Sequence, residues 1–432
     1  MLIKVLKISK ARELALKDRW PRKRRLDEKL LTYVKEIIED VRKRGDEALI
    51  DLTARFDGVN LKVEQLKVSR EEIENAYNMV SGEQLSAVKL AKERVERFER
   101  EILAQIGFEY KDELGVKIRW KYCPIRSVGC YIPGGEAAYP STVIMTVVPA
   151  KVAGVPRVVV CSPPKRSGEI NPLTLVAADL CGADEIYRVG GVQAIAALAY
   201  GTETINPVDK IVGPGNKYVL AAKSIVSCDV PIDHPAGPSE IAILADEGAH
   251  PDYIAWDMIA QAEHGADSVA ILVTTSMRVA RQVIERIMQL LDTVSNGDRV
   301  RAAFEGKGLI LIAGSMDEAI EFVNELAPEH LEIIAEGAHE IAERINSAGL
   351  ILVGCYTPAS LSDYLLGTNH VLPTGGFGRV CSSLSVLSFI KHVSIAEASR
   401  ETLKELWTGV RVLAESEGLP NHALAIKERF KY

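Results

Sequence analysis

The sequence predicts an α/β protein built on parallel sheets. From about residue 116 to residue 353, short β-branched runs alternate with alanine-rich helical runs, which is typical of parallel α/β units. A length of 432 residues allows two or three domains, each with its own hydrophobic core. The loop Asp233-His234-Pro235-Ala236-Gly237-Pro238 divides the alternating region into two parts. We therefore expect two successive parallel α/β domains of similar size.

Helices are expected before the alternating region. Between residues 26 and 56, apolar side chains recur at helical spacing with charged residues between them. A second amphipathic stretch covers about residues 71–106 and is expected to pack as a helix on the surface. Residues 1–25 are assigned to an N-terminal arm, because the basic stretch 19–25 is typical of a solvated terminal segment.

The first α/β domain is expected to span residues 26–238, including these helices. Its predicted strands are 158–160 and 209–212, and its predicted helices are 173–180, 194–200 and 218–226. Three glycine-rich turns stand out: Tyr131-Ile132-Pro133-Gly134-Gly135, Gly190-Gly191-Val192-Gln193 and Gly213-Pro214-Gly215-Asn216-Lys217. The second and third turns each lie between a predicted strand and a predicted helix, where backbone N–H groups can bind a phosphate or a dinucleotide. None matches the dinucleotide or Walker A pattern, so glycines that only close tight turns are the alternative.

The second α/β domain is expected to span residues 239–380. Its predicted strands are 241–244, 269–273, 309–312, 331–334 and 351–353. A stretch rich in glycine, proline and serine then leads into a helical C-terminal segment, residues 381–432. That segment is too short for a core of its own, so we expect it to pack on another surface.

Composition excludes several classes of protein. A net charge of −7 argues against a surface that binds nucleic acid or an anionic membrane. Seven cysteines without a C-x-x-C pair form neither a disulfide framework nor a thiolate zinc site, which favours a reducing compartment. The first residues lack the apolar core of a signal peptide, and no run is long enough to span a membrane. We expect a soluble protein of the cytoplasm.

All eight histidines lie beyond residue 233, and four of them occur in short polar motifs. Histidine titrates near neutral pH and is the commonest nitrogen ligand of transition metals. The motifs are Gln261-Ala262-Glu263-His264, Pro328-Glu329-His330, Thr368-Asn369-His370-Val371-Leu372-Pro373 and Pro420-Asn421-His422. This distribution indicates one site assembled from the second half of the chain, most simply in a metalloenzyme.

Four residues are candidates for a metal site. Gln261 and His264 are three apart in a helical pattern, so both are expected on one helix face, where an amide oxygen and an imidazole can share a divalent cation. Asp363 and His422 would complete a set of two oxygen and two nitrogen ligands that suits zinc or manganese. Such pairs are also common on helices that bind no metal, and spacing does not show that the four residues converge.

Glu329 and His330 are candidates for acid–base catalysis. They are adjacent at the entrance of a predicted strand, a place where α/β proteins position their sites. The alternative is a capping or solvated glutamate beside a packed histidine. The cysteines lie in no such motif and are interpreted as buried structural thiols.

Taken together, these motifs resemble those of the histidinol dehydrogenase family over nearly the whole chain. The resemblance is densest in Tyr131-Ile132-Pro133-Gly134-Gly135, Gly213-Pro214-Gly215-Asn216, Pro235-Ala236-Gly237-Pro238-Ser239-Glu240, Gln261-Ala262-Glu263-His264-Gly265, Ala327-Pro328-Glu329-His330-Leu331 and Gly367-Thr368-Asn369-His370-Val371-Leu372-Pro373-Thr374. Six motifs in the family's order are far more specific than any one of them.

The resemblance implies an NAD-dependent four-electron oxidation of L-histidinol, through L-histidinal, to L-histidine. It implies incomplete Rossmann-like domains, a homodimer whose C-terminal tail closes the partner's site, and one zinc ion per subunit that orients the substrate. The resemblance implies acid–base catalysis by Glu329 and His330, and zinc binding by Gln261, His264, Asp363 and His422. It implies that the four zinc ligands also contact the substrate, together with Ser239, His330, His370 and Glu417. It implies that Tyr131, Gln193 and Asn216 contact NAD.

The sequence differs from the usual sequence of the family near two of these motifs. His234 stands where the family often has a methionine, and Ala359 and Ser362 replace a glutamate and a glycine shortly before Asp363.

Two other classes of protein are compatible with the same residues. A zinc hydrolase could use the four ligands with Glu329 activating a metal-bound water. A non-catalytic binding protein stabilised by the metal would bind the ion without turnover. Reduction of NAD in the presence of histidinol distinguishes the dehydrogenase from both.

Overall fold

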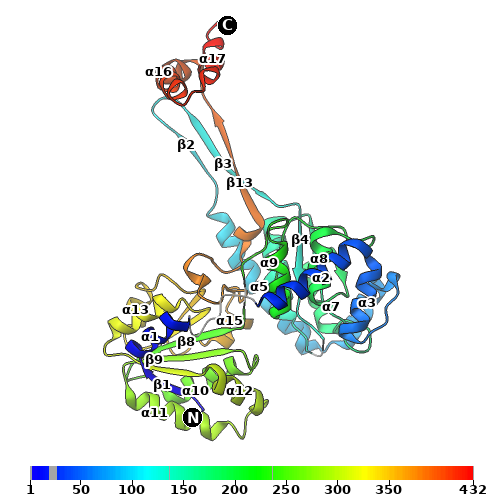
Figure 1. The fold of residues 1–432 in the computed structure, drawn as a ribbon, viewed down its shortest axis with the longest axis vertical. Helices are drawn as coiled ribbons and strands as arrows, with labels where there is room; N and C mark the ends of the chain where they lie inside the picture. Colours follow the sequence, from blue (N-terminus) through cyan, green and yellow to red (C-terminus); the bar gives the residue numbers. More distant parts are fainter. Residues whose placement is uncertain (1, 19–26, 136, 236, 432) are drawn as a thin grey trace.

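The computed structural model describes residues 2–18, 27–135, 137–235 and 237–431. Figure 1 shows two α/β lobes side by side and an arm that projects away from them to a small helical tip. Both lobes are built on parallel sheets, so the α/β class predicted from the sequence is confirmed. No helix within the described ranges is long and apolar enough to cross a membrane.

The first lobe contains a four-stranded parallel sheet in the order β6-β5-β4-β7. Its strands are β4 (Ser127–Tyr131), β5 (Arg157–Cys161), β6 (Glu185–Tyr187) and β7 (Ile211–Val212). The helices around it are α2 (Glu28–Arg44), α3 (Asp46–Asp57), η1 (Val63–Gln65), α4 (Arg70–Met79), α5 (Gly82–Ala104), α6 (Pro140–Ala153), α7 (Pro172–Cys181), α8 (Gly191–Tyr200) and α9 (Lys217–Val226). The strands are buried on both faces, as parallel strands between helices must be.

Each of the two predicted N-terminal helical stretches is a pair of helices. Gly45 adopts a positive φ of 54° and separates α2 from α3. Ser81 begins α5 with a capping box, which separates α5 from α4. The periodic apolar face of α2 is buried against α8 and α9, as its pattern predicted.

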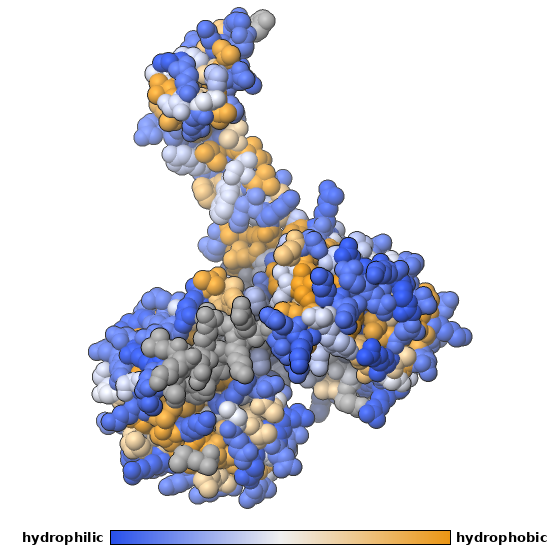
Figure 2. Space-filling view, viewed as in Figure 1, coloured by the Kyte–Doolittle hydropathy of each residue, from blue (hydrophilic) through white to orange (hydrophobic). Residues whose placement is uncertain are grey.

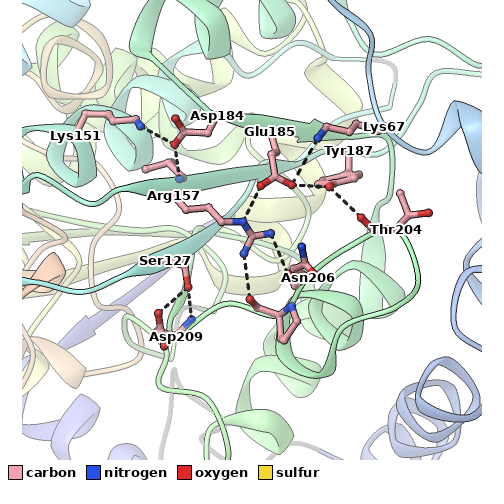
Figure 3. A network of polar contacts seen from close by, with 12 residues as sticks. Lys67, Ser127, Lys151, Arg157, Asp184, Glu185, Tyr187, Thr204, Asn206 and Asp209 are labelled. Carbon is pink, nitrogen blue, oxygen red and sulfur yellow. Dashed lines mark hydrogen bonds and ion pairs between the residues drawn. The ribbon is translucent and has the colours of Figure 1, made fainter.

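A polar network fixes one edge of this sheet (Figure 3). The Arg157 guanidinium donates to the Glu185 carboxylate at 2.6 Å and to the carbonyl oxygen of Pro207 at 3.0 Å. The Tyr187 hydroxyl donates to the same carboxylate at 2.6 Å. These bonds join β5, β6 and the loop before β7, so the strand ends are held in place.

The second lobe contains a six-stranded parallel sheet in the order β1-β10-β9-β8-β11-β12. Its strands are β1 (Lys4–Lys7), β8 (Glu240–Ala245), β9 (Val269–Thr274), β10 (Leu309–Ile312), β11 (His330–Ile334) and β12 (Leu350–Val353). Its helices are α1 (Ile8–Asp18), α10 (Pro251–Ala262), α11 (Met277–Leu290), α12 (Gly297–Lys307), α13 (Met316–Leu326), α14 (Ala338–Ala342) and α15 (Ala359–Tyr364).

The chain's beginning differs from the predicted N-terminal arm. Lys4–Lys7 pair with β10 as an edge strand, and Ile3 and Ile8 on either side are buried in the second lobe. Four residues are too few to show a strand period, so only long-range pairing reveals this element. The basic stretch 19–25 lies outside the described residues.

The arm that projects from the two lobes was not predicted from the sequence. It is an antiparallel sheet of β2 (Phe108–Lys111), β3 (Lys117–Pro124) and β13 (Ile390–Glu397), and it carries α16 (Arg400–Ser416) and α17 (Pro420–Glu428) at its tip. The short helices η2 (Phe377–Arg379) and η3 (Val386–Phe389) precede β13. The segment 381–432 is therefore not helical throughout, because it includes β13, which pairs with a strand far away in sequence.

Candidate active site

A cavity of about 950 Å³ is lined by residues of both lobes. The first lobe lines the cavity with the carboxyl ends of its strands and the loops that follow them, including Tyr131 at the end of β4 and Pro214 after β7. From the second lobe it receives the amino ends of the strands, including Ser239 before β8 and His330 at the start of β11. The first sheet thus presents the carboxyl ends of its strands to the cavity, and the second sheet presents the amino ends.

This arrangement gives the two walls opposite electrostatic character. The first-lobe wall contains the N-terminal ends of α8 and α9, where free N–H groups favour anions. The second-lobe wall contains the C-terminal end of α10, whose carbonyl groups favour cations. One wall is therefore suited to phosphate groups and the other to a metal ion or an ammonium group.

Glu329 and His330 are both buried on the second-lobe wall, about 5% and 4% exposed. A Glu329 carboxylate oxygen accepts a hydrogen bond from the Glu240 amide at 2.6 Å and lies 3.8 Å from His330 Nδ1. Burial raises the pKa of Glu329 well above its usual value and, together with the nearby His370, lowers the pKa of His330 to about 3. An imidazole with this pKa is neutral at physiological pH and can accept a proton.

The Glu329–His330 pair does not lie at the end of the strand where sites of α/β proteins are usually found. Ligand sites of parallel sheets normally lie at the carboxyl ends of the strands. His330 is the first residue of β11, so the pair stands at the amino end instead. The usual rule holds only for the glycine-rich turns of the first lobe, which lie between a strand and a helix as predicted.

Three of the four predicted metal ligands line the cavity: Gln261, His264 and Asp363. The helix α10 ends at Ala262, so His264 lies in the following turn and does not share a helix face with Gln261, contrary to the expectation. Asp363, on α15, places a carboxylate oxygen 3.9 Å from His330 Nε2. Burial raises the Asp363 pKa to about 6, and His264 partly opposes that shift.

These residues fit a zinc ion that takes a further ligand from elsewhere. The Gln261 amide nitrogen is buried without a hydrogen-bond partner among the described residues, so the amide is free to turn its oxygen toward an ion. One chain supplies an amide, an imidazole and a carboxylate, and no group of three His, Cys, Asp or Glu side chains that could hold a metal occurs in its described part. Glu417 and His422 do not line the cavity and lie at the helical tip of the arm, exposed to solvent (Figure 1).

The substrate-side candidates Ser239 and His370 also line the cavity. The His370 Nδ1–H donates to the Asp363 carbonyl oxygen at 2.8 Å, which leaves Nε2 as the acceptor. The Asn369 amide next to it donates to the Met145 carbonyl oxygen on α6 at 2.7 Å. The Thr-Asn-His-Val motif therefore ties the metal-side residues to the first lobe.

Asp363 lines the cavity although Ala359, Ser362 and His234 differ from the residues usual in the family. Ser362 Oγ donates to the Ala359 carbonyl oxygen at 2.7 Å, and the Glu332 carboxylate accepts from the Ala359 amide. His234 is buried with Nε2 3.3 Å from the Val371 carbonyl oxygen. These contacts hold α15 and the His370 loop in place without the usual residues.

The three predicted cofactor residues line the first-lobe wall. The Tyr131 hydroxyl accepts from the Gly191 amide at 3.2 Å, and the buried Gln193 amide oxygen has no partner among the residues the structure describes. The Asn216 side-chain oxygen caps α9 by accepting from the Tyr218 and Val219 amides, so its NH₂ group remains for a ligand. A Cβ at Gly213, whose φ is 115°, would lie 2.1 Å from the Tyr131 carbonyl oxygen, so only glycine fits this turn.

Further cavity residues were not found from the sequence. Tyr33, Phe56 and Asp57 come from the N-terminal helices α2 and α3. Their stretch was interpreted as packing surface, and its amphipathic pattern contains no signal that separates a cavity-lining residue from a solvated one.

A buried Glu-His pair and potential metal ligands face glycine-rich turns across a cavity between two α/β lobes, and this arrangement is typical of one class of protein, an enzyme that acts on a small molecule. Comparison with known proteins gives the family. The sequence profile described as histidinol dehydrogenase matches residues 21–430, and the chain belongs to this family, whose members are oxidoreductases of histidine biosynthesis.

Individual relatives match this chain over most of their length. The histidinol dehydrogenases of Methanothermobacter thermautotrophicus and Methanosarcina mazei are 47% and 45% identical over 94% and 92% of this chain, and 95% and 92% of theirs. The crystal structure of the Elizabethkingia anophelis histidinol dehydrogenase superposes with a TM-score of 0.93 at 36% identity, covering 100% of this chain and 98% of that one.

Proposed function

We propose that the protein oxidises L-histidinol to L-histidine with two molecules of NAD, using Glu329 and His330 for proton transfer and a zinc ion to orient the substrate. The observation that carries the proposal is the cavity itself. A buried Glu-His pair, three side chains of types that can ligate a metal and glycine-rich turns of a kind that can bind phosphate all line this one cavity.

In the first half-reaction, hydride leaves the alcohol carbon of histidinol for the nicotinamide, and the hydroxyl proton must leave as well. His330 is suited to accept that proton because burial keeps its imidazole neutral. The product is histidinal, which remains bound.

In the second half-reaction, water adds to the aldehyde carbon, and hydride leaves the resulting hydrate for a second NAD. Glu329 is the candidate activator of this water. Burial favours the neutral form of this carboxyl group, whereas the hydrogen bond that it accepts from the Glu240 amide favours the ionised form that can take a proton from water. His330 can then accept a hydrate proton, and the carboxylic acid product ionises. No cysteine lines the cavity among the described residues, so acid–base chemistry is preferred to a thiohemiacetal.

Gln261, His264 and Asp363 would hold zinc on the second-lobe wall, where the C-terminal end of α10 favours a cation. When bound, zinc supplies an orienting template for the imidazole and amino nitrogens of the substrate. Ser239 and His370 stand on the same side of the cavity for substrate contact, and Tyr131, Gln193 and Asn216 stand opposite for NAD.

We further propose a homodimer in which the arm of each chain completes the other chain's site. Figure 2 shows apolar side chains along the arm, and those on the tip include Leu413, 64% exposed. An exposed apolar surface of this kind marks an interaction site. The other large exposed apolar residues of arm and tip are Phe108, Tyr110, Val393, Ile395, Leu406, Val412, Leu419 and Leu424. Covering this surface with a second copy would bring Glu417 and His422 to the partner's cavity.

A cytoplasmic location belongs to the same proposal, because all seven cysteines are free thiols, as a reducing compartment would keep them. The central test is the appearance of NADH when the purified protein is given histidinol, histidinal or simple alcohols. We expect about two NADH per histidinol consumed, because each NAD accepts two of the four electrons. Simple alcohols lack the imidazole and should react far more slowly, since the site discriminates between substrates in the transition state. Metal-dependent hydrolysis without NADH would instead support a zinc hydrolase.

A further inference from the structure

We propose that Asp57 and the aromatic side chains around it bind the adenosine half of the cofactor, and that Asp57 selects NAD over NADP. The inference rests on the proposed use of a dinucleotide and goes beyond it by assigning a specificity-determining residue. Asp57 is the last residue of α3 and lines the same cavity as the Glu329–His330 pair.

The cavity extends well beyond the groups that perform the chemistry. The Glu329–His330 pair belongs to the second lobe, whereas Tyr33, Phe56 and Asp57 belong to helices that pack on the first lobe. The turn that follows Gly213 and the start of α9 also line the cavity and favour a diphosphate, and Tyr218 at that start contacts Tyr33 of α2. With the nicotinamide at His330 and the diphosphate at this turn, the adenosine occupies the part of the cavity lined by α2 and α3.

The Asp57 carboxylate has an oxygen atom that is available to accept a hydrogen bond from a neutral donor. Its Oδ2 atom is buried and has no hydrogen-bond partner among the described residues. The carboxylate is close enough to Tyr131 to help raise the pKa of that hydroxyl. A buried acceptor without a donor costs free energy, and the two hydroxyls of a ribose supply donors at the spacing of a carboxylate.

The same carboxylate disfavours NADP. In NADP, a phosphate replaces the ribose 2′-hydroxyl, so a donor to Asp57 is lost and an anion takes its place. Burial intensifies the repulsion between two anions because little water screens them. Dinucleotide-binding α/β proteins use an acidic residue against the ribose in the same chemical role, although on a different element.

Aromatic surface next to Asp57 suits the adenine ring. Tyr33 and Tyr218 meet edge to face, with ring centroids 6.4 Å apart and an interplanar angle of 72°. Phe56 and Tyr218 leave 45% and 38% of their surface exposed, which a flat base can cover. Lys217, the first residue of α9, has its ammonium group 5.4 Å from the Tyr218 ring centroid and lines the same cavity.

The test compares Asp57→Asn with Asp51→Asn, the same substitution at an exposed position of α3 that does not line the cavity. Equilibrium binding of ADP-ribose and of 2′-phospho-ADP-ribose is measured by calorimetry on the full-length, metal-containing protein. We expect Asp57→Asn to weaken ADP-ribose binding about tenfold, the loss of one hydrogen bond to a charged group. Binding of the 2′-phosphorylated ligand should strengthen, so that the preference shifts by about a hundredfold, and Asp51→Asn should change neither.

An unchanged preference, or an equal loss of both ligands, overturns the inference. Asp57→Ser, which removes the charge and leaves space, must shift the preference in the same direction, and thermal unfolding verifies that both variants are folded. The ratio of kcat/KM with NAD to that with NADP supplies a second readout. A shifted ADP-ribose preference without histidinol oxidation refutes the proposed function alone, and histidinol oxidation with an unshifted preference refutes this inference alone.

Discussion

Two inactive variants of this protein should restore each other's activity if the arm of one chain completes the site of another. His330→Ala removes a buried group of the cavity, and His422→Ala removes an exposed group on α17 at the tip of the arm. Each variant alone should be inactive, because every site of its homodimer lacks one of the two residues. A heterodimer should contain one site with both residues intact.

The size of the recovery follows from how chains pair. Random exchange between equal amounts of the two variants makes about half of all dimers mixed. Each mixed dimer has one site built from the intact cavity of one chain and the intact tip of the other, and a second site that lacks both residues. The mixture should therefore recover about a quarter of the activity of the unmodified protein.

The assay is NADH formation from histidinol after the variants have been incubated together under conditions of subunit exchange. Two affinity tags confirm that mixed dimers have formed. A mixture of His330→Ala with Glu329→Ala is the matched control and should stay inactive, because both residues belong to the same cavity wall. If tagged heterodimers form and the His330→Ala/His422→Ala mixture is still inactive, His422 does not complete the partner's site.

Three further predictions address the chemistry and the stability of the fold. Glu329→Gln should slow single-turnover oxidation of histidinal more than that of histidinol, since only the aldehyde step needs activated water; equal losses would contradict this division. Chelation of the metal, or His264→Asn, should abolish NADH formation while circular dichroism still shows a folded protein, because two buried sheets do not depend on an ion; full activity in protein shown to be metal-free would refute the metal requirement. Glu99 is buried and accepts a hydrogen bond from the Val386 amide, and burial raises its pKa from 4.5 to about 7, so this carboxyl lowers the stability of the native state progressively as the pH rises from 4.5 to about 7. Glu99→Gln should raise the free energy of unfolding by about 3 kcal/mol at about pH 8 and by little at about pH 4, where the carboxyl is mostly protonated in both states; denaturant unfolding at the two pH values tests this, and a gain independent of pH would contradict it.

The α/β class and most elements of the two lobes follow from local patterns in the sequence. Buried strands such as β5 and β9 read as continuous β-branched runs, and helices such as α2 show their buried face as a period. These signals are local, because the burial of a residue depends mainly on its own element and face. Motif order also pointed to Gln261, Glu329, His330 and Asp363, and the structure brings these side chains to one cavity.

The pairing of the elements, and the strand ends that each sheet presents to the cavity, could not be predicted from local patterns. β1 joins β10, and β13 joins β3 to form the arm, through contacts between segments far apart in the chain. Asp57 lines the cavity although its helix reads as ordinary surface, and His422 lies outside the cavity of its own chain although its motif reads as part of the site. The physical reason is that local periodicity records which face of an element is buried, whereas register, strand order and the place of a loop depend on distant partners that leave no pattern in the segment itself.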